Sequence, residues 1–219
     1  MRFVQYGCGH SGPAGWLNYD ASLTLRLERL PLLGQFIKKN TQRFPNSIQF
    51  GDIVRGLPIE DNSVDGAYAS HVLEHLSRED MFTALKQTFR MLKPGGVFRL
   101  IVPDLEARAR RYIDDLDAAR SDANDRLLRV SYLGTEANPR GAARIVSEFL
   151  GRNKHLWMWD YPSMKTALES VGFTGTRRCD LGDSNIAQFT AVEQRDRFYD
   201  DAEGFRELAV HCEKPIRKT

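Results

Sequence analysis

The chain has 219 residues, and its 31 Lys and Arg residues nearly balance 29 Asp and Glu residues, leaving a formal net charge of +2. This balance implies no strong field toward nucleic acid or a membrane surface, and no apolar run approaches the ~18 residues of a membrane-spanning helix. The three cysteines, Cys8, Cys179 and Cys212, are widely spaced, which argues against a disulfide framework or a zinc site. We therefore expect one cytoplasmic domain over residues 1–219.

In the first half of the chain, short apolar runs bounded by turn residues predict buried strands. The predicted strands are residues 2–6, 17–19 (ending at Asp20), 48–50 and 64–69. Apolar residues at helical spacing predict a helix over residues 23–39, although Pro31 and Gly34 interrupt it. Ser77 followed by Asp80 marks the capped start of a further amphipathic helix.

The second half continues the alternation of helices and strands. Residues 93–96 end the capped helix, and residues 97–102 form the most continuously apolar strand. Residues 105–155 are charged and compatible with helix, and they predict a helical insertion that covers the substrate at the carboxyl edge of the sheet; a solvated helical face without function is the alternative. A helix over 161–171 and an antiparallel pair, 173–181 with 207–212, close an α/β fold with a mostly parallel sheet.

The segment from Gly7 to Gly12 fits the pattern G-x-G-x-x-G of dinucleotide-binding proteins. That pattern needs a helix after its third glycine, because the helix N-terminus holds the pyrophosphate. Pro13 follows Gly12, and the next strand begins near residue 17, so no crossover helix fits. Asp20 also follows Gly7 by only 13 positions, where the dinucleotide pattern places its acidic residue about 20 residues on. An NAD(P)-dependent sugar-nucleotide reductase is thus a disfavoured alternative.

A nucleoside cofactor without phosphates does not need that helix. S-adenosylmethionine requires backbone N–H groups for its carboxylate, an acidic residue for the ribose and an acceptor for the adenine amine. Glycines let the backbone approach a ligand closely. Asp20 is a candidate for the ribose, and Asp52, just past the third predicted strand, for the adenine amine.

The order and spacing of several motifs resemble the class I S-adenosylmethionine-dependent methyltransferases of the type 11 kind. The matching segments are Tyr6-Gly-Cys-Gly9, Gly15-Trp-Leu-Asn-Tyr-Asp20, Gly51-Asp-Ile53, Leu57-Pro-Ile-Glu-Asp-Asn-Ser-Val-Asp65, His71-Val-Leu-Glu-His75, Leu92-Lys-Pro-Gly-Gly96 and Val102-Pro-Asp104. The resemblance implies a Rossmann-like fold and S-adenosyl-L-methionine as cofactor. By position, it implies a cofactor-binding set of Tyr6, Gly7, Cys8, Gly9, Asp20, Asp52, Ile53 and His71.

Three residues are candidate catalytic groups. His71 follows the fourth strand and could act as a base or bind substrate, or simply bond the backbone beside the cofactor. Asp104, after the strongest strand, could position a nucleophile or form a turn, and His155 lies among aromatic residues that could stack on a sugar or pack. His71 and His75 are four residues apart but lack a third ligand, so no metal site is predicted.

The resulting hypothesis is a methyltransferase that O-methylates a saccharide or a small polar metabolite. The second strand, Gly-Trp-x-Asn-x-Asp, resembles methyltransferases of cell-surface polysaccharide biosynthesis. The chain lacks the N-terminal helices that usually cover the substrate, so residues 105–155 or another subunit of a homodimer must do so. The remaining alternative is a scaffold protein that binds S-adenosylmethionine without catalysis.

Overall fold

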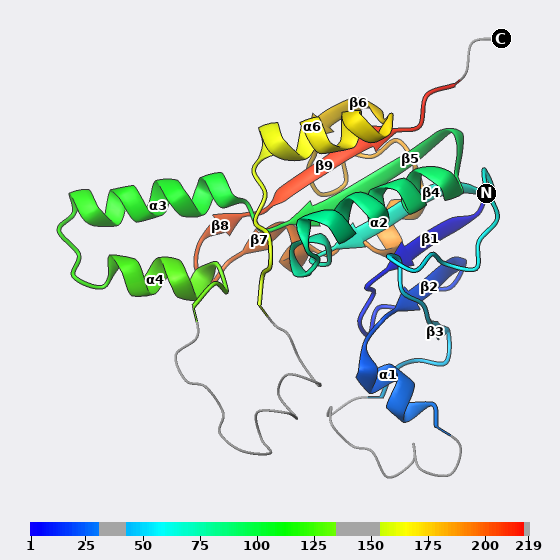
Figure 1. Cartoon of the computed structure of the whole chain (residues 1–219), viewed down its shortest axis with the longest axis horizontal. Helices are drawn as coiled ribbons and strands as arrows, with labels where there is room; N and C mark the ends of the chain where they lie inside the picture. The colour runs from blue at the N-terminus through cyan, green and yellow to red at the C-terminus, as the bar shows by residue number, and fades with distance from the viewer. Residues whose placement is uncertain (31–42, 135–153, 217–219) are drawn as a thin grey trace.

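The computed structural model describes residues 1–30, 43–134 and 154–216. Its centre is a seven-stranded sheet in the order β3-β2-β1-β4-β5-β9-β6 (Figure 1). The strands are β1 (Phe3–Tyr6), β2 (Trp16–Asp20), β3 (Ile48–Phe50), β4 (Val64–Ser70), β5 (Leu92–Val102), β6 (Thr174–Arg178) and β9 (Leu208–Glu213). The strand order starts at β1 in the middle and reverses between β1 and β4, so the carboxyl ends of these two strands form the crevice where α/β proteins bind ligands.

The strand directions confirm the predicted α/β fold. β3, β2, β1, β4 and β5 pair in parallel, whereas β9 pairs antiparallel with both β5 and β6. The predicted strand over 97–102 is longer than expected. Pairing begins at Leu92, opposite Val64, and the register shifts before Gly66 meets Val97. Residues 93–96, Lys-Pro-Gly-Gly, therefore form an irregular part of β5 and do not precede the strand. A β-bulge accommodates a proline and a glycine with positive φ, such as Gly95.

Residues 7–15 connect β1 to β2 without a helix, as the sequence predicts. The helix expected after β2 begins at the predicted residue, as α1 (Leu23–Glu28), with the Ser22 hydroxyl accepting a hydrogen bond from Leu25 N. Residues 31–39 of that predicted helix lie outside the described residues.

Helices α2 (Arg78–Met91) and α6 (Tyr161–Val171) cover one face of the sheet (Figure 1). Ser77, the predicted cap of α2, accepts from Asp80 N, and Asp160 caps α6 by accepting from Ser163 N. Gly172 ends α6 in the left-handed conformation, with φ of 111°. Apolar side chains of these helices join the strands in the larger hydrophobic cluster.

The opposite face is covered by a segment between β6 and β9. It contains a 3-10 helix, η3 (Ala187–Ala191), and the short helix α7 (Arg195–Phe198). Phe189 is fully buried there, with ring centroids 5.9 Å from Phe3 and 5.8 Å from Trp16. A mostly parallel sheet needs cover on both faces, and this C-terminal segment supplies it where the β1–β2 connection has no helix.

Beyond β5 the chain forms α3 (Leu105–Asp117) and α4 (Ala123–Val130), a pair that extends away from the sheet (Figure 1). They begin the predicted helical insertion, of which residues 135–153 lie outside the described residues. A small antiparallel pair, β7 (Tyr199–Asp200) with β8 (Phe205–Arg206), follows α7. Every helix in the described part of the chain is too short or too polar to cross a membrane.

Candidate functional site

The glycine loop begins directly after β1, at the carboxyl edge of the sheet. Cys8 N donates to Tyr19 O at 3.2 Å, and this bond holds the loop against β2. Gly7 and Gly9 adopt positive φ values of 63° and 54°, which favour glycine. An added Cβ at Gly9 would meet no atom within 4 Å, so the space beside this residue is open to a ligand.

Asp20 ends β2 beside this loop and is buried. One carboxylate oxygen accepts from Gly9 N and the other from Ser22 N, each at 2.8 Å. These bonds fix the carboxylate at the loop. A carboxylate has about four lone-pair sites, so two further hydrogen bonds remain available. The arrangement suits the two hydroxyls of a ribose.

Asp52 lies in the turn after β3, at the same edge. Oδ1 accepts from Val54 N at 2.9 Å, while the side chain is 31% exposed and Oδ2 lies 3.5 Å from Arg55 Nε. The neighbouring Ile53 is buried in the large core cluster and so fixes the turn from below. The open space at Gly9, the held carboxylate of Asp20 and the partly exposed Asp52 together fit a nucleoside cofactor such as S-adenosylmethionine.

The side chains of Tyr6 and Cys8 point into the protein interior. The Tyr6 hydroxyl shares a hydrogen bond of 3.0 Å with the Thr88 hydroxyl, and burial raises the pKa of this phenol. Burial, and secondarily the Asp20 charge, raises the pKa of the Cys8 thiol to about 12, so it stays protonated at neutral pH and is a poor nucleophile. Both side chains therefore belong to the protein interior.

His71 follows β4 in the left-handed conformation, with φ of 54°. Its Nε2 lies 3.0 Å from the Arg197 carbonyl oxygen, and its Nδ1 lies 3.5 Å from Glu74 Oε1. Burial lowers the pKa of His71, but the Glu74 carboxylate and the Arg197 carbonyl outweigh burial and raise it above the usual value. Both ring nitrogens thus face acceptors. The contact of Nε2 with a backbone carbonyl favours the alternative to a base, namely a histidine that bonds the backbone.

A cavity of about 500 Å³ opens beside His71. It is lined by His71, Glu74, His75, Pro103, Arg108, Tyr132, His155, Asp196, Tyr199, Asp200, Asp201 and Glu207. Five of these residues are acidic, and the only Lys or Arg among them, Arg108, forms a buried ion pair with Glu207 at 2.9 Å. The cavity therefore has an acidic and hydrogen-bonding lining. The sequence indicates none of the four residues between 196 and 201, because they belong to the unpredicted segment after β6.

His155 lies in this cavity, as the sequence hypothesis requires of a catalytic candidate. It is buried, and burial is the main cause that lowers its pKa below the usual value. Its ring stands 5.1 Å from that of His75 and 5.0 Å from that of Tyr132. Trp159 packs in the core with 3% exposure, whereas Trp157 is 44% exposed.

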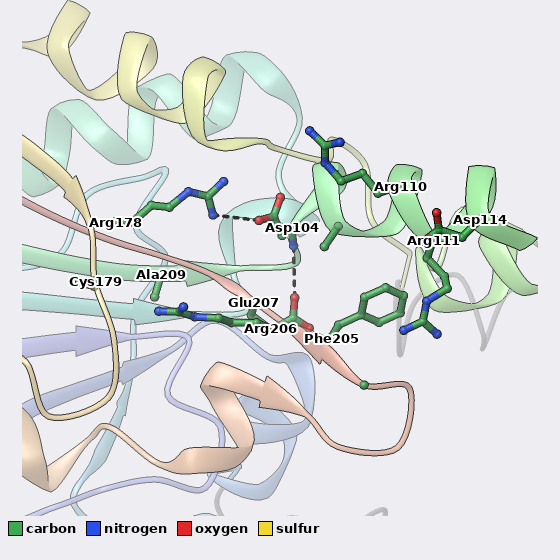
Figure 2. A pocket seen from close by; sticks show the side chains of 12 residues that line it. Asp104, Arg110, Arg111, Asp114, Arg178, Cys179, Phe205, Arg206, Glu207 and Ala209 are labelled. Carbon is green, nitrogen blue, oxygen red and sulfur yellow. Dashed lines mark hydrogen bonds and ion pairs between the residues drawn. The ribbon is translucent and has the colours of Figure 1, made fainter.

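Asp104 points into a different cavity, of about 370 Å³, shown in Figure 2. It is the N-cap of α3: Oδ1 accepts from Glu106 N at 3.0 Å, and Oδ2 accepts from Arg178 at 3.0 Å. The backbone N–H of Asp104 donates a hydrogen bond to Glu207 Oε2 at 3.2 Å. Asp104 thus lines a different cavity from His71 and His155, although Glu207 lines both, and its carboxylate is occupied by a helix cap and an ion pair.

Comparison with known proteins agrees with this geometry. Residues 4–100 match the sequence profile of a methyltransferase domain family, type 11. The fold resembles an S-adenosylmethionine-dependent methyltransferase from Archaeoglobus fulgidus, with a TM-score of 0.52, 16% identity, and coverage of 98% of this chain and 86% of that one. A possible histamine N-methyltransferase from Thermotoga maritima matches with a TM-score of 0.50, 16% identity, and coverage of 97% and 82%. Residues 4–100 therefore match a methyltransferase domain, and the chain shares the fold of S-adenosylmethionine-dependent methyltransferases.

A curated relative matches at 28% identity over 140 residues. It is described as an uncharacterized 37.1 kDa protein in transposon TN4556 of Streptomyces fradiae. The match spans 61% of this chain but only 39% of that protein, so the relative carries further sequence outside the matching part.

Proposed function

We propose that the protein transfers a methyl group from S-adenosylmethionine to a hydroxyl oxygen of a saccharide or of a similar hydroxyl-rich metabolite. The observation that carries this proposal is the acidic cavity beside His71. Carboxylates and imidazoles accept hydrogen bonds from hydroxyl groups, and Tyr132 and Tyr199 add aromatic side chains to the lining. A role in cell-surface polysaccharide biosynthesis rests on the pattern of β2 alone.

The cofactor is assigned to the loop and the two aspartates. The backbone of Gly7 and Gly9 would approach its amino-acid end, Asp20 its ribose and Asp52 its adenine. When bound, the cofactor supplies an activated methyl group. Methyl transfer is an in-line displacement, so holding the acceptor in line can supply much of the rate. We assign that orienting task to the cavity residues and to His71, whose Nε2 is held by the Arg197 carbonyl oxygen.

The region 105–155 is proposed to enclose the acceptor. Arg108 of α3 and Tyr132, just after α4, already line the cavity. Arg108 also binds Glu207 and the Val130 carbonyl, which ties both helices to the strand side of the cavity. Exclusion of water would strengthen the hydrogen bonds made to the acceptor. A homodimer that completes this enclosure stays a prediction.

Cofactor binding is tested by calorimetry with S-adenosylmethionine and S-adenosylhomocysteine. Asp20→Ala should weaken binding by at least about tenfold, since a charged hydrogen bond contributes roughly 1.5–3 kcal/mol. Asp117→Ala, at an exposed position of α3, is the matched control and should bind as the wild type does. Tight NADPH binding with no binding of either sulfur nucleoside would refute the proposal.

The acceptor is tested with S-adenosylmethionine carrying a labelled methyl group and a panel of saccharides and amines, with products read by mass spectrometry. The surplus of carboxylates in the cavity gives one specific reason to include amines, because the lining would also attract an ammonium group. Label recovered only on nitrogen would replace O-methylation with N-methylation. Cofactor binding without label on any acceptor would favour the non-catalytic scaffold.

A further inference from the structure

Glu74 is an unusual buried acid. It lies in a 3-10 turn, η2 (Leu73–His75), directly after β4, and its side chain is 1% exposed. Neither carboxylate oxygen accepts a hydrogen bond from any residue that the structure describes. Oε1 lies 3.5 Å from His71 Nδ1 and 3.9 Å from His75 Nε2, beyond the length of good hydrogen bonds. A buried carboxylate is costly unless it is paired or coordinates a metal, and these two histidines are the ion-pair partners that the structure describes for Glu74.

Two histidines converge on this carboxylate. His75 is adjacent in the chain, and His155 arrives from a segment 80 residues later. One ligand atom from each of Glu74, His75 and His155 lies within 4.8 Å of the others. The sequence offers only the His71 and His75 pair without a third ligand, and the fold supplies that third ligand as His155.

The ring of His75 is also oriented as in a metal site. Its Nδ1 lies 3.1 Å from the Lys154 carbonyl oxygen, to which Nδ1 donates, and its Nε2 is the nitrogen that faces Glu74. Histidines that bind metals typically donate their other ring N–H to a backbone carbonyl in this way. Lys154 immediately precedes His155, so the same backbone segment orients one candidate ligand and supplies another.

We propose that Glu74, His75 and His155 bind one divalent transition-metal ion at the wall of the acidic cavity. Two imidazoles and one carboxylate suit Mn²⁺, Fe²⁺, Co²⁺ or Zn²⁺ better than Mg²⁺ or Ca²⁺, which prefer oxygen ligands only. Ligand atoms about 2.1 Å from a common ion lie at most about 4.2 Å apart, so the present spacing needs only a small contraction.

The proposed ion would face the cavity with open coordination positions, because the protein supplies three ligands. A hydroxyl group of the acceptor that binds there would lose its proton more easily, since a metal ion lowers the pKa of a bound oxygen. This consequence rests on the proposed function, whereas the metal site itself does not. Metal binding can therefore be measured with neither cofactor nor acceptor present.

The test uses the full chain after treatment with EDTA and dialysis. MnCl₂, CoCl₂ and ZnCl₂ are titrated separately by calorimetry, and Mn²⁺ binding is followed by electron paramagnetic resonance. We expect one ion per chain. Glu74→Gln and His155→Gln should each weaken binding by at least about 100-fold, because even residues that only support a ligand affect metal affinity by 10–100-fold.

Two controls separate metal binding from folding. His10→Gln removes an exposed histidine outside the cluster and should bind metal as the wild type does. Circular dichroism of each metal-free variant checks the fold. Glu74→Gln keeps the shape of the side chain and the backbone carbonyl that accepts from Leu156 N at 2.7 Å, so it should fold.

Bound metal should also raise the thermal unfolding temperature of the wild type, since a ligand that binds only the native state stabilises it. The same metal should leave the unfolding temperature of folded Glu74→Gln almost unchanged. The proposal is wrong if the wild type binds none of the three ions with a Kd below about 100 µM, which corresponds to a binding free energy near −5.5 kcal/mol. It is equally wrong if folded Glu74→Gln and His155→Gln both bind metal as tightly as the wild type.

Discussion

At the scale of single residues, the two glycines of the loop have different tasks. Gly7 has no room for a side chain, because an added Cβ would overlap a methyl group of Val72. Gly9 is open, because an added Cβ would meet no atom within 4 Å. Both have positive φ, so an alanine at either position carries a similar backbone cost of about 1 kcal/mol. Alanine substitutions therefore separate folding from ligand binding.

We expect Gly7→Ala to destabilise the protein by clearly more than Gly9→Ala, because only Gly7→Ala must also displace a core side chain. Urea unfolding at pH 7 measures this difference. The double variant Gly7→Ala/Val72→Ala should recover part of the loss. Gly9→Ala should instead weaken binding of S-adenosylhomocysteine in calorimetry while keeping the fold. Equal loss of stability in the two single variants would show that the Val72 contact does not matter.

Asp183 provides a test of pH dependence. Its carboxylate lies 2.7 Å from the buried guanidinium of Arg99 and 2.8 Å from the exposed guanidinium of Arg177. Burial by itself raises the pKa of Asp183, but the hydrogen bonds from Arg177 and Arg99 outweigh it and lower the pKa from 3.8 to about 2. A lowered pKa in the folded state stabilises the protein above pH 3.8, and this contribution is lost as the pH falls toward 2.

Asp183→Asn should therefore be less stable than the wild type at pH 7, and the difference should shrink between pH 4 and pH 2. Urea unfolding at pH 7, 4 and 3 measures it. Asp117→Asn, which changes an exposed aspartate of α3, is the control and should show no such trend. A constant difference for Asp183→Asn across this range would contradict the assigned ion pairs.

At the scale of secondary-structure elements, the segment between β6 and β9 that covers one face of the sheet is the main feature that the sequence does not predict. Its key side chain is Phe189, which packs against Phe3 and Trp16. Phe189→Ala should cost about 3–5 kcal/mol in unfolding free energy, as for other large-to-small core changes. Phe50→Ala, at a position 44% exposed on β3, should cost far less. Denaturant unfolding of both variants tests whether η3 is an essential part of the core.

The sequence predicts the elements that carry strong local signals. β3 and α6 match their expected bounds because a short apolar run between turns and a capped amphipathic helix are recognisable by themselves. η3 and α7 were missed because five and four residues are too short to show a period. Among site residues, Asp20 and Asp52 lie at the predicted edge. Glu74 becomes a candidate metal ligand only because His155 lies beside it. That proximity depends on tertiary contacts, which the sequence alone does not reveal.

At the scale of the whole molecule, the buried ion pair between Arg108 and Glu207 connects α3 with the segment that leads into β9. Both side chains are at most 5% exposed, and two bonds of 2.9 Å join them. Glu207→Gln should cost about 3–5 kcal/mol, because it leaves the Arg108 charge buried without a counter-charge. Adding Arg108→Met should restore part of that loss. Urea unfolding of the two single variants and the double variant gives the coupling energy, and strictly additive losses would contradict this account.

The cover that Phe189 gives to Phe3 and Trp16 also has a consequence for synthesis on the ribosome. These aromatic contacts join residues more than 170 positions apart, so β1 and β2 emerge long before the side chain that buries one of their faces. Contacts so distant in sequence form late. The growing chain therefore exposes an aromatic surface through most of its synthesis. One face of the sheet formed by its first five strands stays uncovered until the C-terminal segment has been synthesised.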